Sequence, residues 1–273
     1  MTATPLDLAP QPKSGQNLML PARAFVSRWK GPRTDLAPVP TVAYGLVAAW
    51  IVAMVAVALL LDVEISRYAD TLPPIFRVIF EKVTRIGTSG YVFAATVLGC
   101  LAALVVYVRR RGLDRARAGL VAARAFYLFA VCAVSGLASV IIKQPIGRPR
   151  PFLIDTYGPF GFHPFVFNAK FASFPSGHTI TAFAMAVAIG FLAPRLRTPL
   201  LIVAVLVAIS RLVLGSHYLS DTMGGALIGI LSAVILRRLF ARRRIVFEAD
   251  GGRIVPRLLP RRRQATTTPS AAG

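Results

Sequence analysis

Three long runs without a charged residue predict three membrane-spanning helices. They cover residues 41–61, 88–108 and 125–142, which are 21, 21 and 18 residues long. A helix needs about 20 mostly apolar residues to cross a hydrocarbon core about 30 Å thick. The first run is too long, and lies too far from residue 1, to be a cleaved signal peptide.

Three shorter uncharged runs follow, at residues 179–193, 198–210 and 222–236. Runs of this length also fit helices in the core of a soluble protein. Each becomes a span if it is extended by one turn through the polar residues at its end, provided that this end is buried in protein rather than in lipid. We therefore predict an all-α protein, a polytopic membrane bundle of six transmembrane helices.

The six predicted spans define a domain over residues 39–240, with basic cytoplasmic tails at 1–38 and 241–273. The first tail is rich in proline and polar residues, and its basic end is expected to lie on the bilayer surface. In the second tail, residues 245–255 contain two β-prone stretches around an Asp-Gly turn. They predict either a small hairpin or an unstructured basic tail.

Composition supports a membrane protein. The chain is 55% hydrophobic and 16% charged, with a mean hydropathy of +0.63, which is too apolar for an ordinary soluble domain. Its net charge of +21 arises from clusters between the apolar runs, and no soluble segment is long enough to form a nucleic-acid-binding face. Cys100 and Cys132 lie inside apolar runs, so we interpret both as small buried hydrophobic residues.

The distribution of Lys and Arg predicts the orientation. If the N-terminus is cytoplasmic, 22 of the 32 cations lie in inside segments and 9 in outside segments, while Arg124 lies at the edge of a span. Cytoplasmic loops carry an excess of Lys and Arg. Both termini are therefore predicted to be cytoplasmic, and residues 143–177 to fold over the outer face.

Polar residues that could act on a substrate gather at the predicted outer ends of the spans. Cations and a helix N-terminus suit a phosphate group, whereas histidine suits a nucleophile or an acid–base catalyst. The residues are Lys143, Arg150, Ser176, Gly177, His178, Arg211, His217 and Asp221. Together they predict a phosphate site with a nucleophile.

Each of these residues alone has a simpler interpretation. His217 and Asp221 are four residues apart and could form only a local hydrogen bond on one helix face. Ser176 could be a helix N-cap, and Lys143 and Arg150 could extend to the membrane edge. A purely structural role for the whole set would, however, leave several buried charges without partners.

Three motifs resemble the signature of a known family. KQPIGRPRP begins at Lys143, PSGH at Pro175 and SRLVLGSHYLSD at Ser210. In this order they are similar to the three-part signature of the type 2 phosphatidic acid phosphatase superfamily, in its bacterial six-span membrane form. The motifs show no departure at the signature positions, and both terminal tails lie outside them.

The resemblance implies a role for each residue. His217 would attack phosphorus in line and form a phosphohistidine, while Asp221 would hold its reactive tautomer. His178 would protonate the leaving oxygen and then activate the hydrolytic water. The phosphate oxygens would be held by Lys143, Arg150, Ser176, the Gly177 N–H and Arg211. No metal or other cofactor is implied.

The implied function is a metal-independent phosphatase that acts on a lipid phosphate or diphosphate at the periplasmic face of a bacterial inner membrane. Candidate substrates are undecaprenyl diphosphate, phosphatidylglycerophosphate, phosphatidic acid and lipid A 1-phosphate, and the sequence does not choose among them. Arg148, an additional cation beside the first motif, slightly favours a diphosphate or a bulky anionic headgroup. The sequence does not indicate an oligomeric state.

Two alternatives remain. Vanadate-dependent haloperoxidases belong to the same superfamily, but they are soluble, and the apolar runs argue against them. A non-enzymatic lipid-binding or transport protein would need the cations alone, so His178, His217 and Asp221 argue against that function. His163 belongs to no motif and is expected to have a structural role in its loop or to line the rim of the substrate site.

Overall fold

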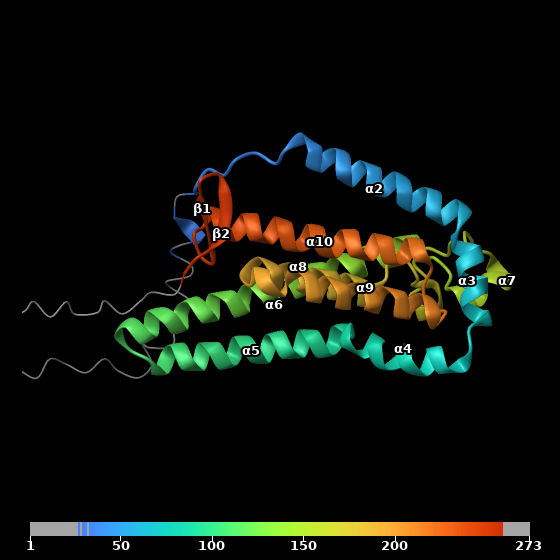
Figure 1. Cartoon of the computed structure of the whole chain (residues 1–273), viewed down its shortest axis with the longest axis horizontal. Helices are drawn as coiled ribbons and strands as arrows, with labels where there is room; N and C mark the ends of the chain where they lie inside the picture. Colours follow the sequence, from blue (N-terminus) through green and yellow to red (C-terminus); the bar gives the residue numbers. More distant parts are fainter. Residues whose placement is uncertain (1–26, 28, 32, 259–273) are drawn as a thin grey trace, which may run out of the picture.

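The computed structural model describes residues 27, 29–31 and 33–258, and these form an elongated bundle of helices (Figure 1). The long helices are α2 (Thr41–Leu60), α5 (Ser89–Arg109), α6 (Gly112–Ile146), α8 (Gly177–Leu192), α9 (Arg197–Val213) and α10 (Leu219–Arg242). Five stretches of the described residues are long and apolar enough to cross a membrane, whereas α8 has only 16 residues. The predicted all-α membrane bundle is confirmed, and the count of six spans is approximate.

Helix α8 is the central helix of the bundle and packs closely against α10. Small residues make this possible, because a Cβ at Gly225 or Gly229 would lie less than 3 Å from the carbonyl oxygen of Ser176 or Ile180. Close approach through small residues is a common way for membrane helices to associate. In contrast, α2 has no buried residue, so its apolar side chains are available to lipid.

One end of the bundle carries short helices that fall between the predicted spans. Helices α3 (Asp62–Thr71) and α4 (Pro74–Ile86) connect α2 to α5, and α7 (Ile154–Tyr157) lies beside them (Figure 1). Two 3₁₀ turns, η1 (Pro151–Leu153) and η2 (Ala169–Phe171), shape the segment between α6 and α8. A third, η3 (Pro194–Leu196), joins the other end of α8 to α9. We call this end, where α3, α4 and α7 lie, the site end.

The opposite end carries a two-stranded antiparallel hairpin, β1 (Phe247–Asp250) and β2 (Arg253–Pro256), which confirms the hairpin of the two predicted possibilities. Gly251 and Gly252 form its turn with φ values of 50° and 76°, which glycine adopts readily. The early chain packs here too, because Thr34 N–H donates to the Arg242 carbonyl at 2.9 Å. The rest of the predicted tails, residues 1–26, 28, 32 and 259–273, lies outside the described residues.

Candidate active site

The end of α6 places the first motif at the site end. Gly147 terminates the helix with φ 59°, and its N–H donates to the Lys143 carbonyl at 2.9 Å. A side chain at Gly147 would collide with the backbone of His163, so glycine is required there. Lys143 therefore lies on the last turn of α6, and Arg148 and Arg150 follow in extended chain.

The three predicted phosphate-binding cations are brought together. Lys143 Nζ donates to the Ala172 carbonyl at 3.0 Å, and it interacts electrostatically with Arg150 and Arg211. Arg211, on the last turn of α9, donates to Thr84 Oγ1 at 2.6 Å. Within the described part of the chain, Nε of Arg150 and Nε of Arg211 are buried without a hydrogen-bond partner. Buried donors of this kind need an acceptor, which a phosphate oxygen would supply.

The second motif forms the N-terminus of α8. Ser176 is the N-cap residue and is fully buried, and its hydroxyl accepts a hydrogen bond from Thr179 at 3.0 Å. Gly177 opens the helix next to Lys143, since a Cβ there would lie 4.0 Å from Lys143 Nζ. The positive end of the α8 dipole therefore points toward the cations, as an anion site requires.

Both histidines that are predicted to be catalytic reach this cluster. His178, in the first turn of α8, interacts electrostatically with Lys143, Arg150 and Arg211, and also with His217. His217 lies in the short connection between α9 and α10, directly after a tight turn at Gly215 with φ 59°. The structure thus brings the second and third motifs to the same place as the first.

Hydrogen bonding fixes the tautomer of His217. Its Nδ1 is 2.8 Å from the carbonyl oxygen of Ser173. A carbonyl only accepts, so Nδ1 carries the ring proton and Nε2 holds a lone pair. Burial, together with the nearby Lys143 and Arg150, lowers the pKa of His217 to about 4, although Asp221 acts in the opposite direction. The ring is therefore neutral at pH 7, as a nucleophile must be.

Asp221 supports His217 less directly than the resemblance implied. Its Oδ2 is 3.7 Å from His217 Nδ1, so the Ser173 carbonyl is the nearer acceptor. The same Oδ2 accepts from Ser173 Oγ at 2.6 Å and from Tyr218 N–H at 2.9 Å. Asp221 thus holds the two segments that flank His217, the Ser173 loop and the start of α10.

The guanidinium of Arg148 is bonded to acceptors within the protein, which corrects the interpretation that it favours a diphosphate or a bulky headgroup. The residue is 3% exposed. Its guanidinium donates to Asp221 Oδ1 and Ser220 Oγ, both at 2.7 Å, and to Asp62 Oδ2 at 2.9 Å. Its Nε donates to the Pro159 carbonyl. With its donors used in this way, Arg148 belongs to the support of the site.

Sequence reasoning missed three of these supporting residues: Asp62, Ser173 and Ser220. Asp62 carried one weak signal, because it is an acidic residue directly after the apolar run of α2. Its partners lie 86 and 158 residues away along the chain, a separation that no local pattern reveals. Ser173 and Ser220 adjoin the second and third motifs, where a serine has many possible roles.

The third histidine has a structural environment. The His163 ring lies 4.4 Å from the Phe171 ring and 5.1 Å from the Tyr157 ring, measured between centroids. The backbone N–H of His163 also donates to the Gly147 carbonyl at 2.8 Å. His163 therefore stabilises the loop that covers the site and fixes the end of α6.

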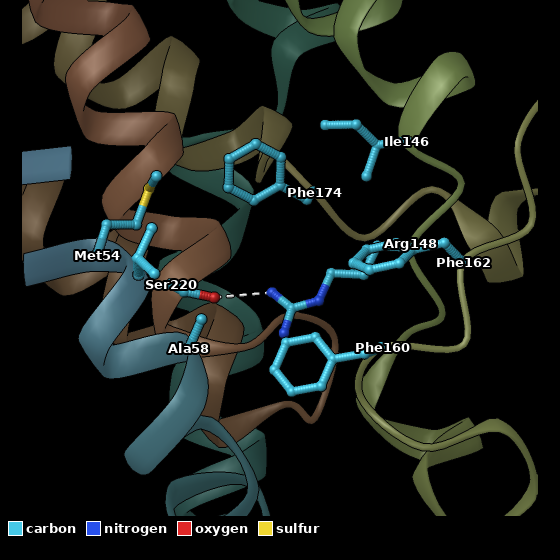
Figure 2. Close-up of a pocket in the computed structure, with 9 residues that line it drawn as sticks. Met54, Ala58, Ile146, Arg148, Phe160, Phe162, Phe174 and Ser220 are labelled. Atoms are coloured by element: carbon cyan, nitrogen blue, oxygen red, sulfur yellow. Dashed lines mark hydrogen bonds between the residues drawn. The ribbon is translucent and has the colours of Figure 1, made fainter. Parts of the chain in front are cut away.

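An apolar cavity of about 200 Å³ lies beside the site (Figure 2). It lies between α2 and the segment that connects α6 to α8, residues 147–176, which we call the covering loop. Met54, Val55 and Ala58 line it from α2, and Phe160 and Phe162 line it from the loop. Its other lining residues are Ile146, Arg148, Phe174 and Ser220. Its two polar lining residues, Arg148 and Ser220, already form a hydrogen bond with each other, so the cavity suits a hydrocarbon group.

Among the described residues, no group of three or more His, Cys, Asp or Glu side chains is placed to hold a metal ion. Cys132 is buried and Cys100 is half-buried, and both are free thiols. Metal independence itself stays a prediction.

Comparison with known proteins places these motifs in a family. The family model described as PAP2 superfamily matches residues 124–245. The chain is 31% identical to a lipid A 1-phosphatase of Rhizobium etli over 205 residues, which cover 74% of this chain and 88% of that protein. It is 32% identical to an undecaprenyl-diphosphatase of Bacillus subtilis over 109 residues, covering 38% and 54%.

A solved structure shares the fold. The PAP2 type phosphatidylglycerolphosphate phosphatase of Bacillus subtilis, a transmembrane protein, superposes with a TM-score of 0.52. The match covers 71% of this chain and 93% of that one, at 23% identity. At this level of identity, the likeness concerns the arrangement of helices.

Proposed function

The chain belongs to the PAP2 superfamily, and on this premise we propose that it is a membrane phosphatase that hydrolyses a lipid phosphate or diphosphate. One observation carries the proposal: the free Nε2 of His217 lies in a cluster with Lys143, Arg150 and Arg211. A neutral imidazole among cations is equipped to attack a bound phosphate, because the cations hold the oxygens while the ring supplies the electron pair.

The reaction would proceed in two displacements. Nε2 of His217 attacks phosphorus, the N–P bond forms, and the bond to the lipid oxygen breaks as His178 donates a proton to that oxygen. His178 then accepts a proton from water, which attacks phosphorus and breaks the N–P bond. Arg150 and Arg211 stabilise the charge on the phosphoryl oxygens in both steps.

A lipid substrate is favoured by the surroundings of the cluster. The apolar cavity shares Arg148 with the hydrogen-bond network of Asp221, and it is bounded on one side by the lipid-accessible helix α2. The covering loop also exposes aromatic side chains, among them Phe152, Phe165 and Phe167. Exposed apolar side chains that gather on one surface are typical of a site that contacts a membrane or another protein.

Lipid A 1-phosphate is the first substrate to test, because the lipid A 1-phosphatase relative aligns over 88% of its length. We propose further that the enzyme lies in a bacterial inner membrane, with both termini cytoplasmic and the active site periplasmic. The 22 to 9 distribution of cations supports this orientation.

The deciding experiment is phosphate release by the purified protein in detergent. The panel contains lipid A 1-phosphate, undecaprenyl diphosphate, phosphatidylglycerophosphate and phosphatidic acid, without added metal. We expect release from at least one lipid, no effect of a chelator, and inhibition by vanadate, which mimics a five-coordinate phosphoryl group. No release from any of the four, or activity that depends on added Mg²⁺, would contradict the proposal.

Cysteine labelling tests the orientation separately. Asp155→Cys and Asp114→Cys are introduced one at a time into a protein that lacks Cys100 and Cys132, and both positions are accessible. A membrane-impermeant thiol reagent on intact spheroplasts should modify position 155 and spare position 114. The opposite labelling would place the site in the cytoplasm.

A further inference from the structure

Asp62 is a buried carboxylate that lies outside all three signature motifs. It begins α3, directly after the membrane helix α2, and its side chain is 0% exposed. Ser220 N–H donates to its Oδ1 at 3.0 Å, and Ser220 Oγ and Arg148 donate to its Oδ2. Asp62 thus forms a buried ion pair with Arg148 and accepts two hydrogen bonds from Ser220, which places its charge against the first turn of α10.

Arg148 joins this charge to Asp221. One guanidinium is shared between two carboxylates, with distances of 2.9 Å to Asp62 and 2.7 Å to Asp221. It also lies over the Tyr218 ring, 4.3 Å from the centroid, and Figure 2 shows it reaching Ser220 beside the apolar cavity. The cluster of Asp62, Arg148 and Asp221 therefore carries one net negative charge.

Ser173 links this cluster to His217, because its hydroxyl bonds Asp221 and its carbonyl bonds the ring. Asp221 Oδ2 accepts from the Ser173 hydroxyl at 2.6 Å, and the Ser173 carbonyl accepts from His217 Nδ1 at 2.8 Å. If Asp62 were neutral, Arg148 would bind Asp221 alone and neutralise it. The guanidinium would also lose the contact that anchors it on the side away from Asp221.

We propose that Asp62 is a positioning residue for the phosphatase reaction. Through Arg148 it holds Asp221 and the Ser173 carbonyl in the places that orient His217. Its charge keeps the cluster negative when phosphorylation at Nε2 makes the His217 ring positive, which stabilises the phosphohistidine and the transition state before it. This inference rests on the proposed function and adds a residue of the α2–α3 corner to the site.

The test compares Asp62→Asn with Glu64→Gln. Both changes neutralise an acidic residue of α3, but Glu64 is exposed whereas Asp62 is buried. We expect Asp62→Asn to lower kcat about 10²-fold, the cost of a small misplacement of reacting groups. Its KM should stay within about threefold of the wild type, because Lys143, Arg150 and Arg211 are untouched. Glu64→Gln should keep both constants.

Active-site titration separates positioning from misfolding. Titration with vanadate, which occupies the phosphate site, counts the competent sites without turnover, so kcat is expressed per competent site. A merely structural role predicts fewer vanadate-binding sites with normal kcat per site, and this result would overturn the proposal. So would a rise in KM at unchanged kcat, or an Asp62→Asn protein that behaves like Glu64→Gln.

Two further variants cover the case in which Asp62→Asn does not fold. Ser220→Ala removes one donor from Asp62 and should lower kcat in the same way but less, with KM unchanged. Arg148→Lys should lower kcat as Asp62→Asn does, and a double variant should lose no more than the worse single variant, because the two residues act through one link. Additive losses would refute the link. If the wild type releases no phosphate, the proposed function fails first.

Discussion

The two ends of the bundle are stabilised in different ways. At the site end, buried polar residues such as Asp62, Arg148 and Asp221 are held by charge and directional hydrogen bonds. At the hairpin end, Tyr127 packs edge-to-face on Phe240 and Phe247, with ring centroids 5.4 and 5.0 Å apart. Burial of apolar rings is non-directional, whereas a hydrogen bond weakens steeply when its distance or angle changes.

This difference matches what each end must do. A nucleophile needs one tautomer and one direction of approach, which the bonds around His217 define. The hairpin end only has to keep its ends of the helices together. We therefore expect substitutions at the site end to act mainly on turnover, and those at the hairpin end to act mainly on stability.

The largest effect is expected for His217→Ala, which should abolish turnover while the melting temperature stays near that of the wild type. No other described side chain is placed to form the covalent intermediate. His163→Ala is the matched control, because His163 packs in the aromatic part of the loop and should retain most activity. Phosphate release by His217→Ala near the wild-type rate would exclude the phosphohistidine.

His178→Ala should lower kcat by about 10² to 10⁴, the usual loss for a missing general acid or base. The loss should shrink with an aryl phosphate, because an aryl leaving group needs less protonation. His217→Ala should not be rescued by that substrate. Equal losses on lipid and aryl phosphates would show that His178 does not act as the acid.

Much of the bundle follows from the sequence, because hydrophobic runs are local. The predicted run at residues 41–61 became α2, and the hairpin at 245–255 followed from local β-propensity and a turn. Helices α3 and α4 were missed, since their mixed polar composition resembles a loop. The amphipathic α4 becomes interpretable only once α9 is known to pack against it.

For the candidate site, sequence patterns indicated which side chains meet but not what supports them. Lys143, His178 and His217 are parts of motifs, and the structure brings them together. Arg148 was given the wrong partner, because a cation beside a phosphate motif resembles a ligand and its bonds to Asp62 and Asp221 connect distant segments. Support of this kind depends on tertiary contacts, which a local pattern does not contain.

At the hairpin end, Phe247→Ala should lower stability by about 3–5 kcal/mol, the usual cost of removing a buried aromatic ring. Phe247 is fully buried and packs on Tyr127, and the Arg237 guanidinium lies 5.9 Å from its ring centroid. Thermal melts in detergent should show the loss, while kcat per competent site stays unchanged. A lower kcat per site would mean that the two ends are coupled.

The smallest effect is expected at the apolar cavity. Ala58→Phe would fill part of the space between α2 and the covering loop, so KM for a long-chain lipid phosphate should rise about tenfold. This equals about 1.4 kcal/mol, or roughly two buried methylene groups.

The control Val52→Phe adds the same ring at a residue of α2 that is 69% exposed, and it should leave KM unchanged. Neither variant should affect a water-soluble aryl phosphate, which has no chain to place. If Ala58→Phe raised KM equally for both substrates, the cavity would be part of the phosphate site and not a place for the lipid chain.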